Sequence, residues 1–93
     1  FKQVTIIGCG LIGSSLARVV RRHDLAGKLV CADLSEDVCA QTKSLQLADV
    51  TTTDLGHAVA AADFVTIAVP VGAYGKVMET IAPYLLPGVV ITD

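Results

Sequence analysis

The most constraining feature of this sequence is a glycine-rich turn that joins a short apolar run to a segment with helical spacing. Residues 4–7 are β-branched, and the helical spacing begins by Leu11. The turn between them consists of Gly8, Cys9, Gly10, Leu11, Ile12 and Gly13. Such a pattern predicts a buried strand, a tight turn and a helix in immediate succession.

Each glycine of this turn suits a different physical task. Gly8 allows the sharp turn off the strand, Gly10 lets a pyrophosphate approach the backbone because it has no Cβ, and Gly13 lets the helix lie close to the strand. The N-terminus of the helix offers free N–H groups and a partial positive charge to phosphates. The turn therefore predicts a dinucleotide-binding site that includes Cys9, Leu11 and Ile12.

Strand-like and helix-like apolar periods alternate along the whole chain. Strands are predicted at 4–7, 29–32, 50–52, 64–69 and 89–92. Helices are predicted at 11–23, from the cap Ser35 to about residue 45, from the cap Asp54, and over a segment that Pro83 bends or ends. The 53% hydrophobic and 17% charged composition suits strands buried on both faces. We expect one α/β domain with a Rossmann-type doubly wound parallel sheet of strand order 3-2-1-4-5.

Two helices carry specific expectations about their buried faces. The helix at 11–23 is expected to be amphipathic, with apolar residues at Ile12, Leu16, Val19 and Val20. The third helix is expected to place one apolar face inward, formed by Leu55, Ala58, Val59 and Ala62.

Asp33 follows the second predicted strand, twenty residues after Gly13. A carboxylate at this position can accept hydrogen bonds from both hydroxyls of an adenosine ribose, and it repels a 2′-phosphate. The following residues, Leu34 and Ser35, supply no arginine for such a phosphate. NAD is therefore favoured over NADP. The alternative is that Asp33 is only a turn residue at the strand end.

The end of the fourth predicted strand is expected to lie beside the same cofactor. Ligands of open α/β sheets bind outside the carboxyl ends of the strands, near the point where strand order reverses. Ala68, Val69 and Pro70 occupy that position. The alternative reading is that Pro70 only terminates the strand.

Other kinds of function find little support. The net charge of −2 gives no basic face for nucleic acid, and no apolar run reaches the length of a membrane span. His23 and His57 are expected at the surface, and Tyr74 and Tyr84 as packing residues. Three cysteines without metal-ligand spacing are expected to be reduced, partly buried thiols of a cytoplasmic protein. No residue is predicted to be catalytic and none to bind a metal.

Three longer strings resemble the prephenate/arogenate (cyclohexadienyl) dehydrogenase family of tyrosine biosynthesis. They are VTIIGCGLIGSSLA at 4–17, ADFVTIAVPV at 62–71 and IAPYLLPGVVITD at 81–93. The resemblance implies that Gly8 to Gly13 and Asp33 bind NAD. It also implies an oxidoreductase in which hydride passes from a hydroxyl-bearing ring carbon to NAD and loss of carbon dioxide aromatises the ring.

In that family the catalytic histidine, the substrate-binding arginines and the helical domain that forms the homodimer follow this region. The chain starts at Phe1 and stops at Asp93 directly after an apolar run. We therefore expect residues 1–93 to be the NAD-binding domain of a longer enzyme, with residues 89–92 as an exposed apolar edge. Two alternatives remain: the cofactor domain of another NAD-dependent enzyme, such as a hydroxyacid dehydrogenase or imine reductase, and a non-catalytic nucleotide-binding module.

Overall fold

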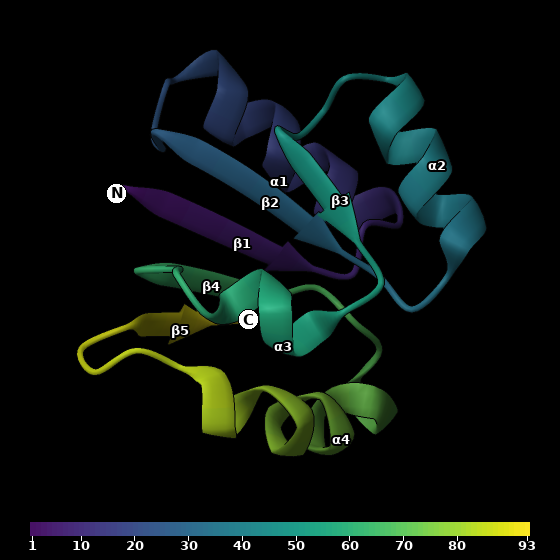
Figure 1. Cartoon of the computed structure of the whole chain (residues 1–93). Coiled ribbons are helices and arrows are strands. Elements are labelled where there is room, and N and C mark those ends of the chain that lie inside the picture. The colour runs from purple at the N-terminus through teal and green to yellow at the C-terminus, as the bar shows by residue number, and fades with distance from the viewer.

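The computed structural model describes all 93 residues as one parallel five-stranded sheet with helices on both faces (Figure 1). The strand order is β3-β2-β1-β4-β5, which confirms the predicted doubly wound order. The elements are β1 (Gln3–Ile7), α1 (Leu11–Arg22), β2 (Lys28–Ala32), α2 (Glu36–Ser44), β3 (Val50–Thr52), α3 (Leu55–Val59), β4 (Phe64–Ile67), α4 (Val71–Ile81), the 3₁₀ turn η1 (Ala82–Tyr84) and β5 (Val90–Thr92).

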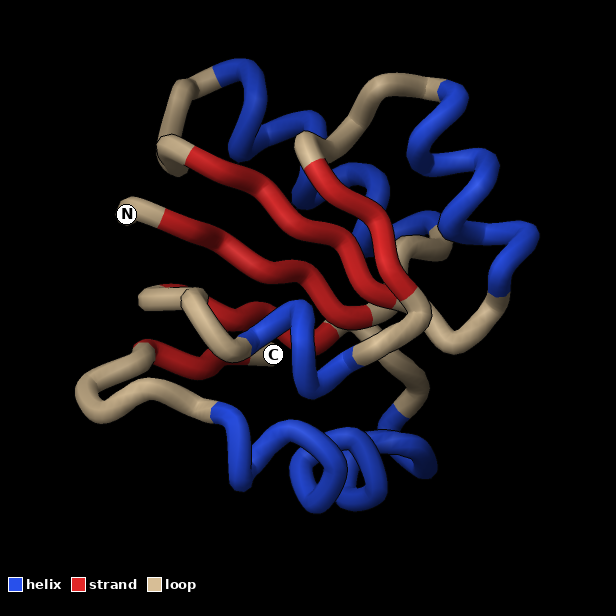
Figure 2. The backbone as a smooth tube through the Cα atoms, in the orientation of Figure 1, coloured by secondary structure: helices blue, strands red, loops and turns tan.

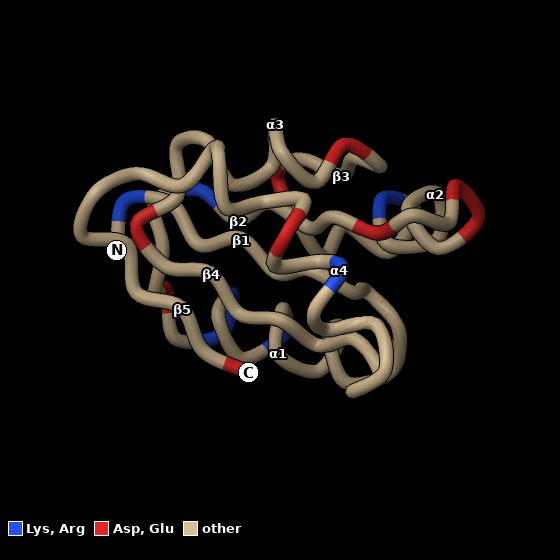
Figure 3. Tube along the Cα trace, turned by 90° about the horizontal axis from the view of Figure 1, so that it is seen from below, with Lys and Arg blue, Asp and Glu red and all other residues tan.

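Two apolar clusters cover the two faces of the sheet. Successive side chains of a strand point to opposite faces, so Ile6 and Ile7 enter different clusters. Ile7 packs with residues of α3 and α4, whereas Ile6 packs with Ala17 of α1. Figure 3 shows α3 and α1 on opposite sides of the strands. Every residue of β1 is buried, since this strand is central and covered twice.

Two polar side chains of β1 are buried beneath α3. The Thr5 hydroxyl donates to the carbonyl of Ala58 at 2.7 Å, and the Gln3 amide donates to the same carbonyl at 3.2 Å. Buried polar groups need such partners, because an unpaired one loses its hydrogen bonds to water without replacement. The bonds tie the central strand to the end of α3.

The third helix is shorter than its apolar spacing predicts. It ends at Val59, so Ala62 is buried but lies beyond the helix, in the turn before β4. Its first turn begins as expected, with the Asp54 carboxylate accepting a hydrogen bond from the His57 N–H at 3.0 Å. The predicted third strand at 50–52 is confirmed.

The buried face of α1 differs from the expected one. Gly13 and Ala17 are its buried residues, whereas Ile12 is 68% exposed and Val19 is 47% exposed. The helix lies so close to β1 that only small residues fit along the line of contact. The expectation that Ile12 and Val19 face the core is therefore wrong, although Leu16 and Val20 pack partly against it.

The C-terminal part of the chain follows its predicted course (Figure 2). Helix α4 ends at Ile81, and Pro83 lies in the 3₁₀ turn that follows. Strand β5 pairs only with β4, so it forms one edge of the sheet, and Val90 is 48% exposed there. No helix combines the length and the apolar character that crossing a membrane requires.

Candidate functional site

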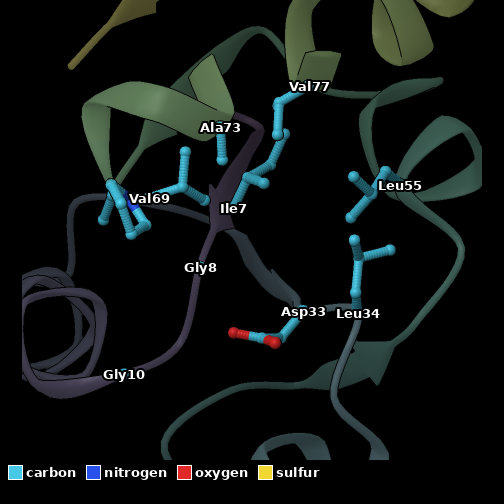
Figure 4. Close-up of a pocket in the computed structure, with 11 residues that line it drawn as sticks. Ile7, Gly8, Gly10, Asp33, Leu34, Leu55, Val69, Ala73 and Val77 are labelled. Atoms are coloured by element: carbon cyan, nitrogen blue, oxygen red, sulfur yellow. The ribbon is translucent and has the colours of Figure 1, made fainter. Parts of the chain in front are cut away.

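The predicted site residues gather at the carboxyl ends of β1, β2 and β4 around a cleft of about 270 Å³ (Figure 4). Seven of the eleven line it: Gly8, Gly10, Asp33, Leu34, Ala68, Val69 and Pro70. Leu11 and Ile12 line a second cleft of about 660 Å³ on the other side of the turn, which also reaches Ala68, Val69 and Pro70. Cys9 and Gly13 line neither of these two clefts, because both are buried beneath the turn.

The backbone explains why glycine occupies two positions of the turn. Gly8 has φ +93°, and a Cβ built on it would lie 2.6 Å from the carbonyl oxygen of Ala68. A Cβ on Gly13 would lie 1.8 Å from the carbonyl oxygen of Gly8. Any larger residue at either place would push the turn away from β4 or the helix away from β1.

Gly10 is different, because a Cβ built on it would meet no atom within 4 Å. The residue lines both clefts, so the space beside it is open to a ligand. Packing within the chain gives no reason for a glycine here, whereas close approach of a phosphate to the backbone does.

Helix α1 begins with backbone donors that have no partner within the chain. Gly10 is its N-cap and offers no side-chain cap, and the amides of residues 10–13 donate no hydrogen bond. By contrast, Ser35 caps α2 and Asp54 caps α3. Four free N–H groups and the positive end of the helix dipole suit a dianionic pyrophosphate.

The Asp33 carboxylate lies beside the glycine turn and lines the same cleft as Gly8 and Gly10 (Figure 4). Its Oδ2 accepts a hydrogen bond from the Cys9 N–H at 2.9 Å, and its Oδ1 accepts one from the Ser35 N–H at 2.9 Å. A carboxylate oxygen can accept two hydrogen bonds, so each keeps room for a ribose hydroxyl. No lysine or arginine lines this cleft.

Strand β4 ends directly against the glycine turn. The Ala68 N–H donates to the carbonyl of Ile7 at 2.7 Å, which continues the pairing of β4 with β1 beyond the last strand residue. Pro70 then serves as the N-cap residue of α4. Strand β4 ends at Ile67, short of the predicted 64–69, so Pro70 does not itself terminate the strand, whereas it does line both clefts.

Cys9 is a packed thiol, as its sequence context predicts. Its exposed fraction is 3%, and its Sγ lies 3.6 Å from the carbonyl oxygen of Ala32. The pKa of Cys9 is raised well above its usual range by a hydrogen bond with the Cys31 thiol and by burial, which disfavours the thiolate. A thiol in this state is not a nucleophile at neutral pH.

The remaining titratable side chains form no second site. His23 and His57 are exposed, and Cys31 and Cys39 are buried. No group of three or more His, Cys, Asp or Glu side chains lies close enough together to hold a metal ion. Tyr84 packs its ring against Gly56, where a Cβ would approach to 2.7 Å.

Sequence reasoning missed the apolar floor of the first cleft. Ile7, Leu55, Ala73 and Val77 line it from β1, α3 and α4. Their apolar spacing marks them as core residues and carries no signal that distinguishes a core face from a cleft wall. The packing of α3 and α4 on the face of the sheet that carries Ile7 brings them to the same place.

The sequence of this chain matches a family of known proteins. A family model described as the prephenate dehydrogenase nucleotide-binding domain matches residues 16–93. The chain belongs to this family. A cyclohexadienyl dehydrogenase of Zymomonas mobilis is 42% identical to the chain over 93 residues, which are 100% of the chain and 32% of that protein.

Solved structures of the same family superpose closely on this nucleotide-binding domain. Prephenate dehydrogenase from A. aeolicus, in complex with hydroxyphenyl propionate and NAD+, gives a TM-score of 0.92 at 26% identity. The match covers 100% of this chain and 33% of that one. Arogenate dehydrogenase of Synechocystis gives 0.89 at 27% identity, covering 98% and 32%. The chain thus spans about a third of the length of the relatives it matches.

Proposed function

We propose that this domain binds NAD across the glycine turn. The pyrophosphate accepts hydrogen bonds from the free amides at the start of α1, and Gly10 leaves the space for it. The adenosine half occupies the 270 Å³ cleft beside Asp33 and Leu34, and the nicotinamide half extends into the 660 Å³ cleft beside Leu11 and Ile12. The single observation that carries this proposal is that the four unpaired amides of residues 10–13 begin at Gly10, which lines the same cleft as the Asp33 carboxylate.

The other predicted residues complete this arrangement. Gly8, Cys9 and Gly13 shape the turn, and Ala68, Val69 and Pro70 form the wall that both clefts share. In this proposal residues 1–93 act as one cofactor-binding domain. When bound, NAD supplies a hydride acceptor, and no side chain of these residues is assigned a catalytic role.

We further propose that NAD is preferred over NADP because of Asp33. A 2′-phosphate on the ribose would lie against this carboxylate, and no cation of the cleft would compensate the repulsion. Replacing Asp33 with alanine should weaken NAD binding. It should also lower the ratio of the affinity for NAD to the affinity for NADP. Titration of both cofactors measures this ratio, and an unchanged ratio would show that Asp33 does not contact the ribose.

For the full-length protein we propose oxidative decarboxylation of prephenate or arogenate in tyrosine biosynthesis, carried out in the cytoplasm by a homodimer. Family membership and the cyclohexadienyl dehydrogenase relative support this proposal. The acid–base group and the substrate pocket would come from segments beyond residues 1–93. The test is NADH formation by the full-length gene product with each substrate, and no reduction of NAD with either one would refute it.

A further inference from the structure

The Asp33 carboxylate is already engaged with the backbone before any ligand is considered. It accepts one hydrogen bond from Cys9 in the glycine turn and one from Ser35, the N-cap residue of α2. The residue itself follows β2, where its N–H donates to the carbonyl of Thr52 at 3.1 Å. Asp33 therefore connects the end of β2, the start of α2 and the turn between β1 and α1.

The glycine turn has a flexible backbone, which a hydrogen bond from Asp33 can restrain. Cys9 lies between two glycines, which lose more backbone freedom on ordering than any other residue. Among residues 9–13 only the Cys9 N–H has a partner within the chain, and that partner is Asp33. A hydrogen bond to an ionised acceptor is stronger than a neutral one. Together with the hydrogen bonds of Ser14 to the carbonyls of Cys9 and Gly10, it holds the turn in place while the other four amides stay unpaired.

We propose that Asp33 is also a positioning residue for the pyrophosphate site, so that ribose and pyrophosphate recognition depend on one carboxylate. The inference rests on the proposed binding of NAD. If so, loss of the carboxylate weakens the binding of a dinucleotide even when its adenosine ribose has no hydroxyl group that could donate a hydrogen bond to Asp33. A residue that acts only as a ribose ligand would have no such effect.

The experiment is a thermodynamic cycle with two ligands and two variants. The ligands are NAD and an NAD analogue whose adenosine ribose lacks both hydroxyl groups, and the variants are Asp33→Ala and Asp33→Asn. Calorimetric titration should show that Asp33→Ala lowers the affinity for the analogue by about three- to tenfold. This is the effect of losing much of one charge-assisted hydrogen bond. Asp33→Asn should recover part of that loss, because its amide oxygen can still accept from the Cys9 N–H.

A matched control alters the start of α2 but keeps the hydrogen bond between the Cys9 N–H and the Asp33 carboxylate. Ser35→Ala removes the hydroxyl that caps α2 by accepting from the Val38 N–H at 3.3 Å, but it keeps the Ser35 N–H that Asp33 accepts. It should lower the unfolding temperature and leave the affinity for the analogue unchanged. If Asp33→Ala and the wild type bind the analogue equally, Asp33 does not position the turn.

A measurement without ligand separates this inference from the proposed function. Hydrogen exchange of the Cys9 amide, followed by NMR, should be slower in the wild type than in Asp33→Ala, while Ser35→Ala should match the wild type. Equal exchange rates in the wild type and Asp33→Ala would overturn the positioning role. Failure of the wild type to bind NAD, with the exchange difference present, would refute the proposed function and leave the restraint established.

Discussion

The contact between α1 and β1 makes Gly13→Ala a demanding test of the fold. The built Cβ lies 1.8 Å from the Gly8 carbonyl oxygen, whereas ordinary contacts begin at 3.4 Å. The helix would have to move by about 1.6 Å, and a gap of 0.5–1 Å already removes a quarter to a half of a dispersion contact. Ala17 would lift away from Ile6 in the same movement.

We expect this substitution to cost about 3 kcal/mol or more, because the obstructing atom belongs to the backbone and cannot rotate aside. A chain of this length has a total stability of roughly 5–14 kcal/mol. The unfolding temperature should therefore fall by at least about 12 °C, at about 4–8 °C per kcal/mol.

Thermal unfolding followed by circular dichroism measures the effect. Gly75→Ala is the matched control, because a Cβ on Gly75 meets nothing within 4 Å and lies inside α4. It should stabilise the protein by about 0.5–1 kcal/mol. A Gly13→Ala variant that melts within about 4 °C of the wild type would refute the close packing of α1 against β1.

Three further predictions concern stability and reactivity. The pKa of Asp63 is lowered because its carboxylate accepts hydrogen bonds from the Lys2 and Gln3 amides. The ionised carboxylate therefore stabilises the folded state above the unfolded pKa of about 3.9. This stabilisation is lost as the pH falls through the lower pKa of the folded state. Urea midpoints should fall across that acid range, and less steeply in Asp63→Asn. Ile81→Ala, at a fully buried position, should cost about 2–5 kcal/mol in the same assay. The three cysteines, each at most 8% exposed, should react with a thiol reagent only as fast as the protein opens, and rapid stoichiometric labelling of the native protein would contradict their burial.

Much of this architecture could be predicted from local sequence. The alternation of strand-like and helix-like periods is a local property, and right-handed crossovers leave few ways to assemble it. The glycine turn and Asp33 were also predictable as neighbours, since both follow parallel strands whose carboxyl ends meet at one edge. These predictions needed no knowledge of side-chain packing.

The buried face of α1 could not be predicted in the same way. Apolar spacing favours Ile12 and Val19 as core residues, but the distance between helix and strand decides which positions face the sheet. Here that distance is so short that Gly13 and Ala17 occupy the contact. The length of α3 likewise depends on a tertiary contact, because Thr5 and Gln3 bind the Ala58 carbonyl near its end.

The link between Asp33 and the glycine turn was also beyond sequence reasoning. The donors of its two hydrogen bonds carry no sequence signal, because they are the backbone amides of Cys9 and Ser35. Only the relative placement of β1 and β2, in the register that pairs Ile7 with Ala32, brings the carboxylate within 2.9 Å of the turn.

Calorimetric titration of NAD into the wild type and Gly10→Ala tests whether the glycine turn holds the pyrophosphate. The added methyl group meets no atom of the chain, so its only expected structural cost is about 0.5–1 kcal/mol from a poorer helix cap. It would stand where the pyrophosphate approaches the backbone. We predict that the wild type binds NAD and that Gly10→Ala, still folded, binds it at least about tenfold more weakly, a difference of about 1.4 kcal/mol. Equal affinities in the two proteins, or no binding by the wild type, would contradict the assignment of this turn to the cofactor.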